Sequence, residues 1–264
     1  MPDASASGVR IEYDDRGSGE PALLLLTGWC SSRARWARFA DVAGSRRRVL
    51  GFDWRGHGGS ERDVGDFGLD EVVADALAVV EASGAEAVVP CAASHSGWVA
   101  IELRRRLGAR VPKLVHADWM LAVPSDRYMA VIRQLDSDDW AAARNLLFEI
   151  WAAGEDTPWL REVIGVMDQQ GEDMWRRGGR VIEASYVENE SPLFTFSRLE
   201  PPVPVLHVYG QPQDPDYLAL QRRFAAQHEW FHVRKIDAKT HFAMLEDPGG
   251  LADTVEAFVS EAGR

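Results

Sequence analysis

The most informative segment of this chain is Val88-Val89-Pro90-Cys91-Ala92-Ala93-Ser94-His95-Ser96-Gly97-Trp98. A short apolar run ends in small residues, and a helix-patterned segment opens at Val99. This order predicts a strand, a sharp turn and a helix, with Ser96 at the turn. On such an elbow the hydroxyl is held above the end of the sheet, and neighbouring N–H groups point at the same space. The stretch departs from the pattern G-x-S-x-G, because Ser94 and Trp98 occupy the two glycine positions.

Apolar runs on both sides of this elbow predict a mostly parallel sheet. An edge strand is expected at 9–16, and buried strands at 22–26, 48–52, 113–117, 203–209 and 230–236. Segments with helical spacing lie between them, at 69–82, 97–107, 217–227 and 251–262. Strands that alternate with helices are typical of an α/β fold with helices on both faces of the sheet.

The pattern changes between residues 125 and 197, where strand-like runs vanish and helical segments rich in tryptophan take over. An insertion of this kind predicts a cap over the strand ends. We therefore expect a first core segment at 1–124, a helical cap at 125–197 and a second core segment at 198–264.

Composition and charge narrow the class of protein. The chain has 264 residues, 46% of them hydrophobic and 27% charged, with a formal net charge of −12. This acidic balance argues against a surface for nucleic acid or anionic membrane. No apolar run approaches the roughly 20 residues that span a bilayer, and the N-terminus has no signal-peptide pattern. Two cysteines indicate neither a disulfide framework nor a cysteine metal site, so we expect a cytoplasmic monomer or homodimer.

Three further segments favour the α/β-hydrolase fold, in which a serine, an acid and a histidine follow in that chain order. Thr27-Gly28-Trp29 follows a buried strand, where an oxyanion-hole N–H is donated in this fold. The backbone N–H groups of Trp29 and Gly97 are the candidate donors. Thr240-His241-Phe242 follows the last strand, where the catalytic histidine is expected. The predicted architecture is thus an α/β-hydrolase fold, a mostly parallel sheet flanked by helices, with the helical cap inserted after the sixth strand of that fold.

The acid has more than one candidate. Asp214 and Asp216 follow the strand at 203–209, whereas Asp118 follows the strand before the cap. Either position can orient a histidine, because the role needs only a carboxylate within reach of Nδ1–H. A Ser96-His241-Asp triad would make the protein a serine esterase or amidase. A third possible class of function is a receptor with this fold that binds its ligand without turnover.

Longer blocks resemble the cofactor-independent 2,4-dioxygenases that open the ring of 3-hydroxy-4(1H)-quinolones. The similar blocks are Gly28-Trp29-Cys30, Ser94-His95-Ser96-Gly97-Trp98, Asp118-Trp119, Trp151, Trp175-x4-Arg180-Val181-Ile182-Glu183-x2-Tyr186, Ser191-Pro192, Gln211-Pro212-x2-Pro215-x-Tyr217, Gln227-His228-x-Trp230-Phe231 and Thr240-His241-Phe242. In that family the acid follows the earlier strand, which favours Asp118. Ser31 differs, since it stands where these relatives carry histidine, and this leaves the fine substrate preference open.

The resemblance implies cleavage of a 3-hydroxy-4(1H)-quinolone that carries a 2-alkyl group, by O₂, to an N-acylanthranilate and carbon monoxide. Such a reaction belongs to N-heteroaromatic catabolism and quorum quenching. It implies no cofactor and no metal, with O₂ as the co-substrate and a small aromatic N-heterocycle as the only other partner.

The same resemblance assigns the roles of the site residues. His241 is the expected base, Asp118 the acid that stabilises it, and Ser96 a hydrogen-bonding group for the substrate. His95, Trp29, Gly97 and Trp151 are the expected substrate-binding residues: Trp29 and Gly97 offer N–H groups, and the other two line the pocket.

Overall fold

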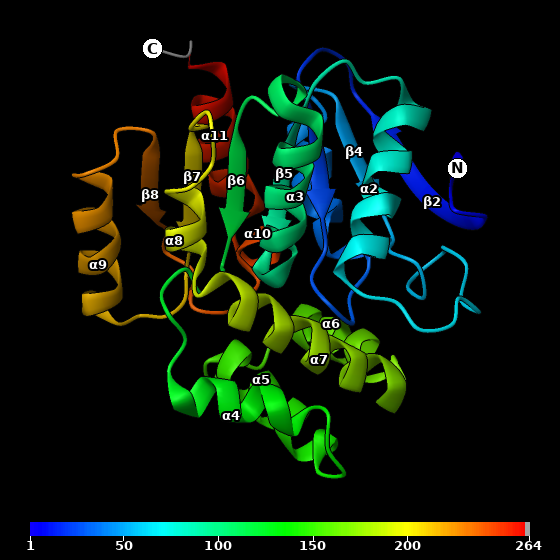
Figure 1. Ribbon diagram of the computed structural model, residues 1–264, viewed down its shortest axis with the longest axis vertical. Helices are drawn as coiled ribbons and strands as arrows, with labels where there is room; N and C mark the ends of the chain where they lie inside the picture. Colours follow the sequence, from blue (N-terminus) through cyan, green and yellow to red (C-terminus); the bar gives the residue numbers. More distant parts are fainter. Residues whose placement is uncertain (262–264) are drawn as a thin grey trace.

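The computed structural model describes residues 1–261, which form an eight-stranded sheet with helices on both faces (Figure 1). The strand order across the sheet is β1-β2-β4-β3-β5-β6-β7-β8. The strands are β1 (Asp3–Ala6), β2 (Val9–Arg16), β3 (Ala22–Leu26), β4 (Val49–Phe52), β5 (Val88–Ala93), β6 (Leu114–Ala117), β7 (Val205–Tyr209) and β8 (Phe231–Lys235). All neighbouring pairs from β4 to β8 are parallel, which confirms the α/β-hydrolase architecture.

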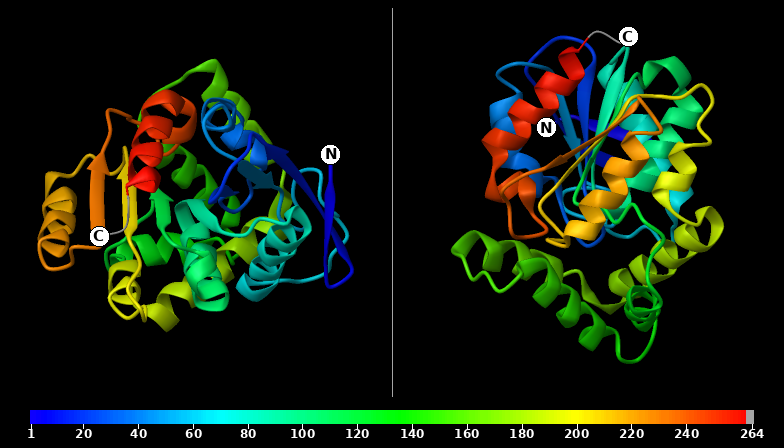
Figure 2. Two further views of the ribbon diagram at one scale, coloured as in Figure 1. Left: turned by 90° about the horizontal axis from the view of Figure 1, so that it is seen from above. Right: turned by 90° about the vertical axis from the view of Figure 1, so that its left-hand side faces the viewer.

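Burial of the strands follows their place in the sheet. Every residue of β3, β5 and β7 is buried, because helices cover both faces there. Helices α1 and α11 contact each other on one face, and α2 and α3 contact each other on the opposite face (Figure 2). The helices of the core are α1 (Ala37–Ala43), α2 (Leu69–Ser83), α3 (Gly97–Leu107), α9 (Pro215–Ala225), α10 (Ala243–Glu246) and α11 (Pro248–Ser260).

Helices α4 to α8 lie between β6 and β7 in the chain, and α4 to α7 lie together beyond one end of the sheet (Figure 1). Their bounds are α4 (Asp126–Gln134), α5 (Trp140–Ala152), α6 (Pro158–Asp168), α7 (Gly171–Asn189) and α8 (Pro192–Phe196). Gly179 of α7 permits close packing, because a Cβ there would lie 2.7 Å from the Leu135 Cβ. Gly178 faces Trp29, since a Cβ there would be in ordinary contact with the Trp29 side chain at 3.6 Å. The cap therefore packs directly on the loop after β3.

Strand β1 has no counterpart in the sequence prediction. It pairs antiparallel with β2 at the edge of the sheet, and only its two alanines are buried. Four residues with such small inward side chains carry too little apolar pattern to predict a strand. Among the helices in residues 1–261, none is long and apolar enough to span a membrane.

Candidate active site

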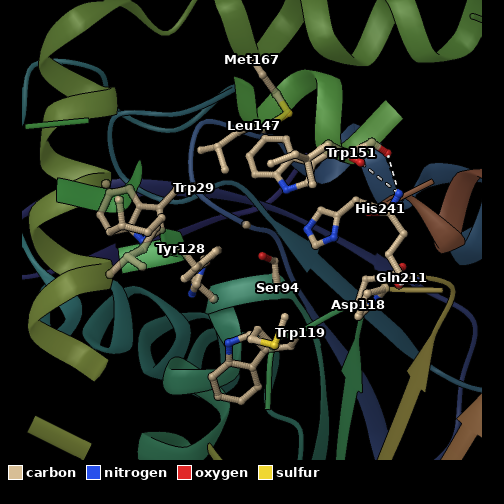
Figure 3. A pocket seen from close by; sticks show the side chains of 18 of the residues that line it. Trp29, Ser94, Asp118, Trp119, Tyr128, Leu147, Trp151, Met167, Gln211 and His241 are labelled. Carbon is tan, nitrogen blue, oxygen red and sulfur yellow. Dashed lines mark hydrogen bonds between the residues drawn. The ribbon is translucent and has the colours of Figure 1, made fainter. Parts of the chain in front are cut away.

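A cavity of about 360 Å³ lies where the strand ends meet the cap. Such a volume is within the range of small-molecule sites. Figure 3 shows core side chains on one side of it and the cap residues Leu147 and Met167 on the other. Its lining is mostly aromatic and aliphatic: Gly28, Trp29, Arg35, Ser94, His95, Asp118, Trp119, Met120, Tyr128, Ile132, Leu135, Leu147, Ile150, Trp151, Ala153, Met167, Trp175, Gly178, Ile182, Gln211, Pro212, Gln213 and His241.

The elbow after β5 is present, and its strained residue is Ser94. Ser94 has a φ of +56°, in the left-handed region, and begins the short 3-10 helix Ser94–Ser96 that leads into α3. Non-glycine residues adopt this conformation at a cost, and it is typical of the nucleophile position on such elbows. Ser94 lines the cavity, and its hydroxyl points into the same space as the His241 ring (Figure 3).

Ser96 lies in the turn after β5 as predicted, but the prediction that it faces the site is wrong. Ser96 is fully buried, and its Oγ lies 2.8 Å from the Ala93 carbonyl oxygen and 3.1 Å from that of Leu26. The residue two positions after the elbow serine must be small. For Ser94 that residue is Ser96, which is small, whereas for Ser96 it would be the bulky Trp98. That spacing was the signal in the sequence that could have identified Ser94.

Gly97 also fails as an oxyanion-hole donor. Its N–H donates to the carbonyls of Ser94 and His95 within the 3-10 turn, and it does not line the cavity. Its lack of a side chain has a packing reason, because a Cβ there would collide with the Trp119 ring. With Ser94 on the elbow, the N–H that follows it belongs to His95. The N–H of Trp29 stays available as the second candidate donor, since within residues 1–261 it donates no hydrogen bond to a protein group.

His241 and Asp118 line the same cavity from two different loops. Asp118 follows β6 with a φ of +47°, and its Oδ1 accepts hydrogen bonds from the N–H groups of Gly210 (2.7 Å) and Gln211 (3.1 Å). Its Oδ2 accepts a hydrogen bond from the Ala243 N–H at 3.2 Å. These bonds fix the carboxylate beside the His241 loop. Among residues 1–261 no direct hydrogen bond joins it to the imidazole.

Burial shifts the pKa values of both groups. It raises the pKa of the Asp118 carboxyl to about 6, although three backbone N–H groups and the charge of Arg35 stabilise the ionised form. Burial, helped by the charge of Arg35, lowers the pKa of His241 well below its ordinary value. At neutral pH the carboxylate is therefore ionised and the imidazole is a free base.

The three other predicted binding residues line the cavity as expected. Trp29 stacks on Phe67, with ring centroids 5.7 Å apart. Trp151, from the end of α5, stacks on the His241 ring, with ring centroids 5.2 Å apart. The Trp151 carbonyl accepts a hydrogen bond from the main-chain N–H of His241 at 2.9 Å. His95 Nε2 lies 2.8 Å from the Tyr128 hydroxyl, and burial lowers the pKa of His95 to about 3.

Besides Ser94, the cavity residues that were not predicted from the sequence include Arg35, Tyr128 and Gln211. Gln211 Nε2 lies 3.1 Å from the Ile150 carbonyl oxygen, 3.3 Å from that of Trp151 and 2.7 Å from that of Lys239, so it joins the cap to the His241 loop. Gln211 belongs to a block that resembles the dioxygenases, which was the available signal. Arg35 and Tyr128 lie on segments whose sequence pattern carries no such signal.

The remaining candidates lie elsewhere. Asp214 and Asp216 are exposed and do not line the cavity, so they are not placed to assist His241. Ser31 is buried outside the cavity lining. Within residues 1–261, no group of three or more His, Cys, Asp or Glu side chains is placed to hold a metal ion.

Comparison with known proteins places this fold and site in the α/β hydrolases. The sequence model of the alpha/beta hydrolase family matches residues 23–254. An esterase from Exiguobacterium antarcticum has the same fold, with a TM-score of 0.79 at 17% identity over 98% of this chain and 99% of that one.

More specific similarity concerns ring-cleaving dioxygenases. The chain is 39% identical to the 2-heptyl-3-hydroxy-4-quinolone dioxygenase AqdC2 of Rhodococcus erythropolis over 97% of both chains. It is 33% identical to the 1H-3-hydroxy-4-oxoquinoline 2,4-dioxygenase of Pseudomonas putida, over 98% of this chain and 99% of that protein. A solved structure of an AqdC variant in complex with its substrate, the Pseudomonas quinolone signal, has a TM-score of 0.94 at 32% identity over 99% of both chains. The chain therefore belongs to the 3-hydroxy-4-quinolone dioxygenase family within the α/β hydrolases.

Proposed function

We propose that this protein cleaves the heterocyclic ring of a 2-alkyl-3-hydroxy-4(1H)-quinolone with O₂ and releases carbon monoxide and an N-acylanthranilate. The observation that carries the proposal is the pair His241 and Asp118 in an aromatic cavity, in a chain 39% identical to a 2-heptyl-3-hydroxy-4-quinolone dioxygenase over nearly its whole length. Aromatic and aliphatic walls suit a flat bicyclic ring with an apolar substituent.

In the proposed mechanism the neutral His241 imidazole accepts the proton of the 3-hydroxyl group. The O–H bond breaks, its electron pair stays on the oxygen, and the ionised Asp118 stabilises the imidazolium. The N–H groups of Trp29 and His95 and the Ser94 hydroxyl hold the anion. The delocalised anion then passes an electron to O₂. The substrate radical and superoxide combine to a C2 peroxide, whose terminal oxygen attacks C4. The O–O, C2–C3 and C3–C4 bonds then break, so both O₂ atoms remain in the product carboxylate and acyl group, C3 leaves with its oxygen as carbon monoxide, and the imidazolium loses its proton to water.

This scheme uses no cofactor, because the substrate anion supplies the electrons. Oxygen uptake measured with purified protein and 2-heptyl-3-hydroxy-4(1H)-quinolone tests it directly. We expect one O₂ consumed and one carbon monoxide released per quinolone, both unchanged by a metal chelator. Uptake that a chelator stops and an added metal ion restores would contradict the cofactor-free scheme.

Variants separate this reaction from ester or amide hydrolysis. His241→Ala should lower kcat/KM about 10²- to 10⁴-fold, the range for loss of a general base. Ser94→Ala should leave measurable ring cleavage, since the hydroxyl only binds the anion. A serine hydrolase would instead lose all turnover in Ser94→Ala, because the covalent step is lost. Hydrolysis of aryl esters by the wild-type protein, without oxygen uptake on any quinolone, would refute the proposal.

The cytoplasmic location, the monomeric or homodimeric state and the division at residues 125–197 remain predictions. The length of the 2-alkyl group is tested by comparing kcat/KM across substrates with methyl to nonyl substituents.

A further inference from the structure

The cavity contains a buried cation that the mechanism above does not use. Arg35 belongs to the 3-10 helix Arg33–Trp36, after the loop that carries Trp29, and its side chain lines the cavity although the residue is only 4% exposed. Among the lining residues in the described part of the chain, it is the one that carries a full positive charge. Burial lowers the pKa of Arg35 to about 10, against the charge of Asp118, so the guanidinium stays charged at neutral pH.

This guanidinium has few protein partners. Nη2 donates to the His241 carbonyl at 3.0 Å, and the group lies over the Phe242 ring, 4.5 Å from its centroid. Nε is buried without a hydrogen-bond partner. Within residues 1–261 no carboxylate lies within 4.0 Å of Arg35. A buried cation without a paired anion is costly, and an anionic ligand in the cavity would relieve that cost.

Arg35 borders the part of the cavity where the substrate anion is expected. A Cβ built on Gly28 would lie 3.5 Å from Arg35 Nη1 and 3.8 Å from the Ser94 Cβ. Nη1 therefore borders the corner between the strained Ser94 and the loop whose next residue, Trp29, offers its N–H. Donors and a positive charge converge on one side of the cavity.

We propose that Arg35 is a catalytic residue that stabilises the deprotonated 3-hydroxy-4-quinolone by direct electrostatic contact. This inference rests on the proposed function, because it names the group that balances the charge of that substrate. Proton transfer to His241 creates one cation and one anion inside an apolar cavity. The site holds one fixed charge of each sign: Asp118 compensates the imidazolium, and Arg35 compensates the substrate anion.

Other titratable groups share the cavity with Arg35: Asp118, His241, His95 and Tyr128. The charge of Arg35 also disfavours the imidazolium, since it contributes to the lowered pKa of His241. Arg35 stabilises a negative substrate oxygen near Ser94 more than it destabilises the His241 imidazolium. The reason is that Nη1 borders the Ser94 corner, whereas Nη2 contacts the His241 main chain and not its ring. The net effect of Arg35 is then to favour the ionised substrate.

Anaerobic binding tests this, because without O₂ the substrate stays intact in the site and its ionised form has its own absorption band. The pH at which 2-heptyl-3-hydroxy-4(1H)-quinolone ionises is measured in complex with the wild type, Arg35→Met, Arg35→Lys and Arg35→Gln. An opposite charge at close range shifts an ionisation by about one to three pH units. We expect Arg35→Met and Arg35→Gln to raise the ionisation pH by at least one unit, and Arg35→Lys to restore most of the shift.

The matched control is Arg38→Met, which removes the same charge from an exposed position on α1 and should leave the ionisation pH unchanged. In air, Arg35→Met should lose at least tenfold in kcat/KM, with recovery in Arg35→Lys. An equal ionisation pH in the wild type, Arg35→Met and Arg35→Gln would overturn the proposal and leave Arg35 as a support for the His241 loop. Should the wild type neither bind nor oxidise the quinolone, the proposed function itself would fail.

Discussion

Two serines two residues apart have opposite environments, and the backbone decides which of them meets the substrate. The positive φ of Ser94 turns its side chain out of the strand direction and into the cavity, while the helical backbone of Ser96 turns its hydroxyl back to the carbonyls of Leu26 and Ala93. Ser96 therefore stabilises the elbow, and Ser94 is the serine that faces the cavity.

Alanine substitutions should separate the two serines. Ser94→Ala should reduce kcat/KM for ring cleavage about tenfold, the value of one hydrogen bond to a charged group, with little change in the free energy of unfolding. Ser96→Ala should lower the free energy of unfolding by about 1 kcal/mol, because it removes a satisfied buried hydroxyl, and leave kcat/KM within about twofold. Urea unfolding and steady-state kinetics give both quantities. The reverse pattern would restore Ser96 to the site.

At the scale of elements, the cap is connected to the catalytic loops by a few polar contacts. The Gln211 amide donates to two carbonyls at the end of α5 and to Lys239 before His241, while its N–H holds Asp118. Helix α5 also supplies Trp151, whose ring covers His241. The cap is thus joined to the loops of Asp118 and His241 by Gln211, and also by the hydrogen bond from the His241 main-chain N–H to the Trp151 carbonyl.

Replacing Gln211 should loosen the cap while the core stays folded. Gln211→Ala should increase amide exchange in the last turn of α5 and lower kcat/KM about tenfold, since Trp151 is held less firmly over His241. Gln213→Ala is the matched control, because the Gln213 amide donates to Gly210 and Ala238, both in the core. Hydrogen exchange followed by mass spectrometry distinguishes them. Equal exchange in α5 for both variants would show that Gln211 does not hold the cap.

At the scale of the whole molecule, several histidines are buried in their neutral form. Burial lowers the pKa of His57 and of His207 to about 4. His57 lies between two backbone groups, with Nδ1 2.9 Å from the Arg55 carbonyl oxygen and Nε2 accepting from the Cys30 N–H at 3.2 Å. A buried neutral histidine stabilises the fold above the pKa of about 6.5 that it has in the unfolded chain. This stabilisation is lost as the pH falls toward the pKa of about 4 in the folded protein, because the unfolded chain then binds a proton that the folded protein does not.

The free energy of unfolding should therefore fall in acid, and His57→Gln should reduce that fall. Between pH 7 and pH 5 the linkage relation gives a loss of about 2 kcal/mol for His57 alone. His57→Gln can keep both hydrogen bonds without titrating. Between pH 7 and pH 5 the free energy of unfolding of this variant should therefore fall by about 2 kcal/mol less than that of the wild type. His232→Gln, at an exposed position, serves as the control. Identical pH profiles for the wild type and His57→Gln would refute the assignment.

Local sequence patterns were enough to predict the alternation of strands and helices, the elbow after β5, the helical insertion and the place of His241 after the last strand. These features follow from local periodicity and from turn residues, which act over a few positions. Which serine faces the cavity became known from the three-dimensional structure, because it depends on the φ of a single residue. The structure also revealed Arg35, whose guanidinium meets the carbonyl of a residue 206 positions away. Contacts of this kind arise only when distant loops meet at the strand ends, and no local pattern encodes them.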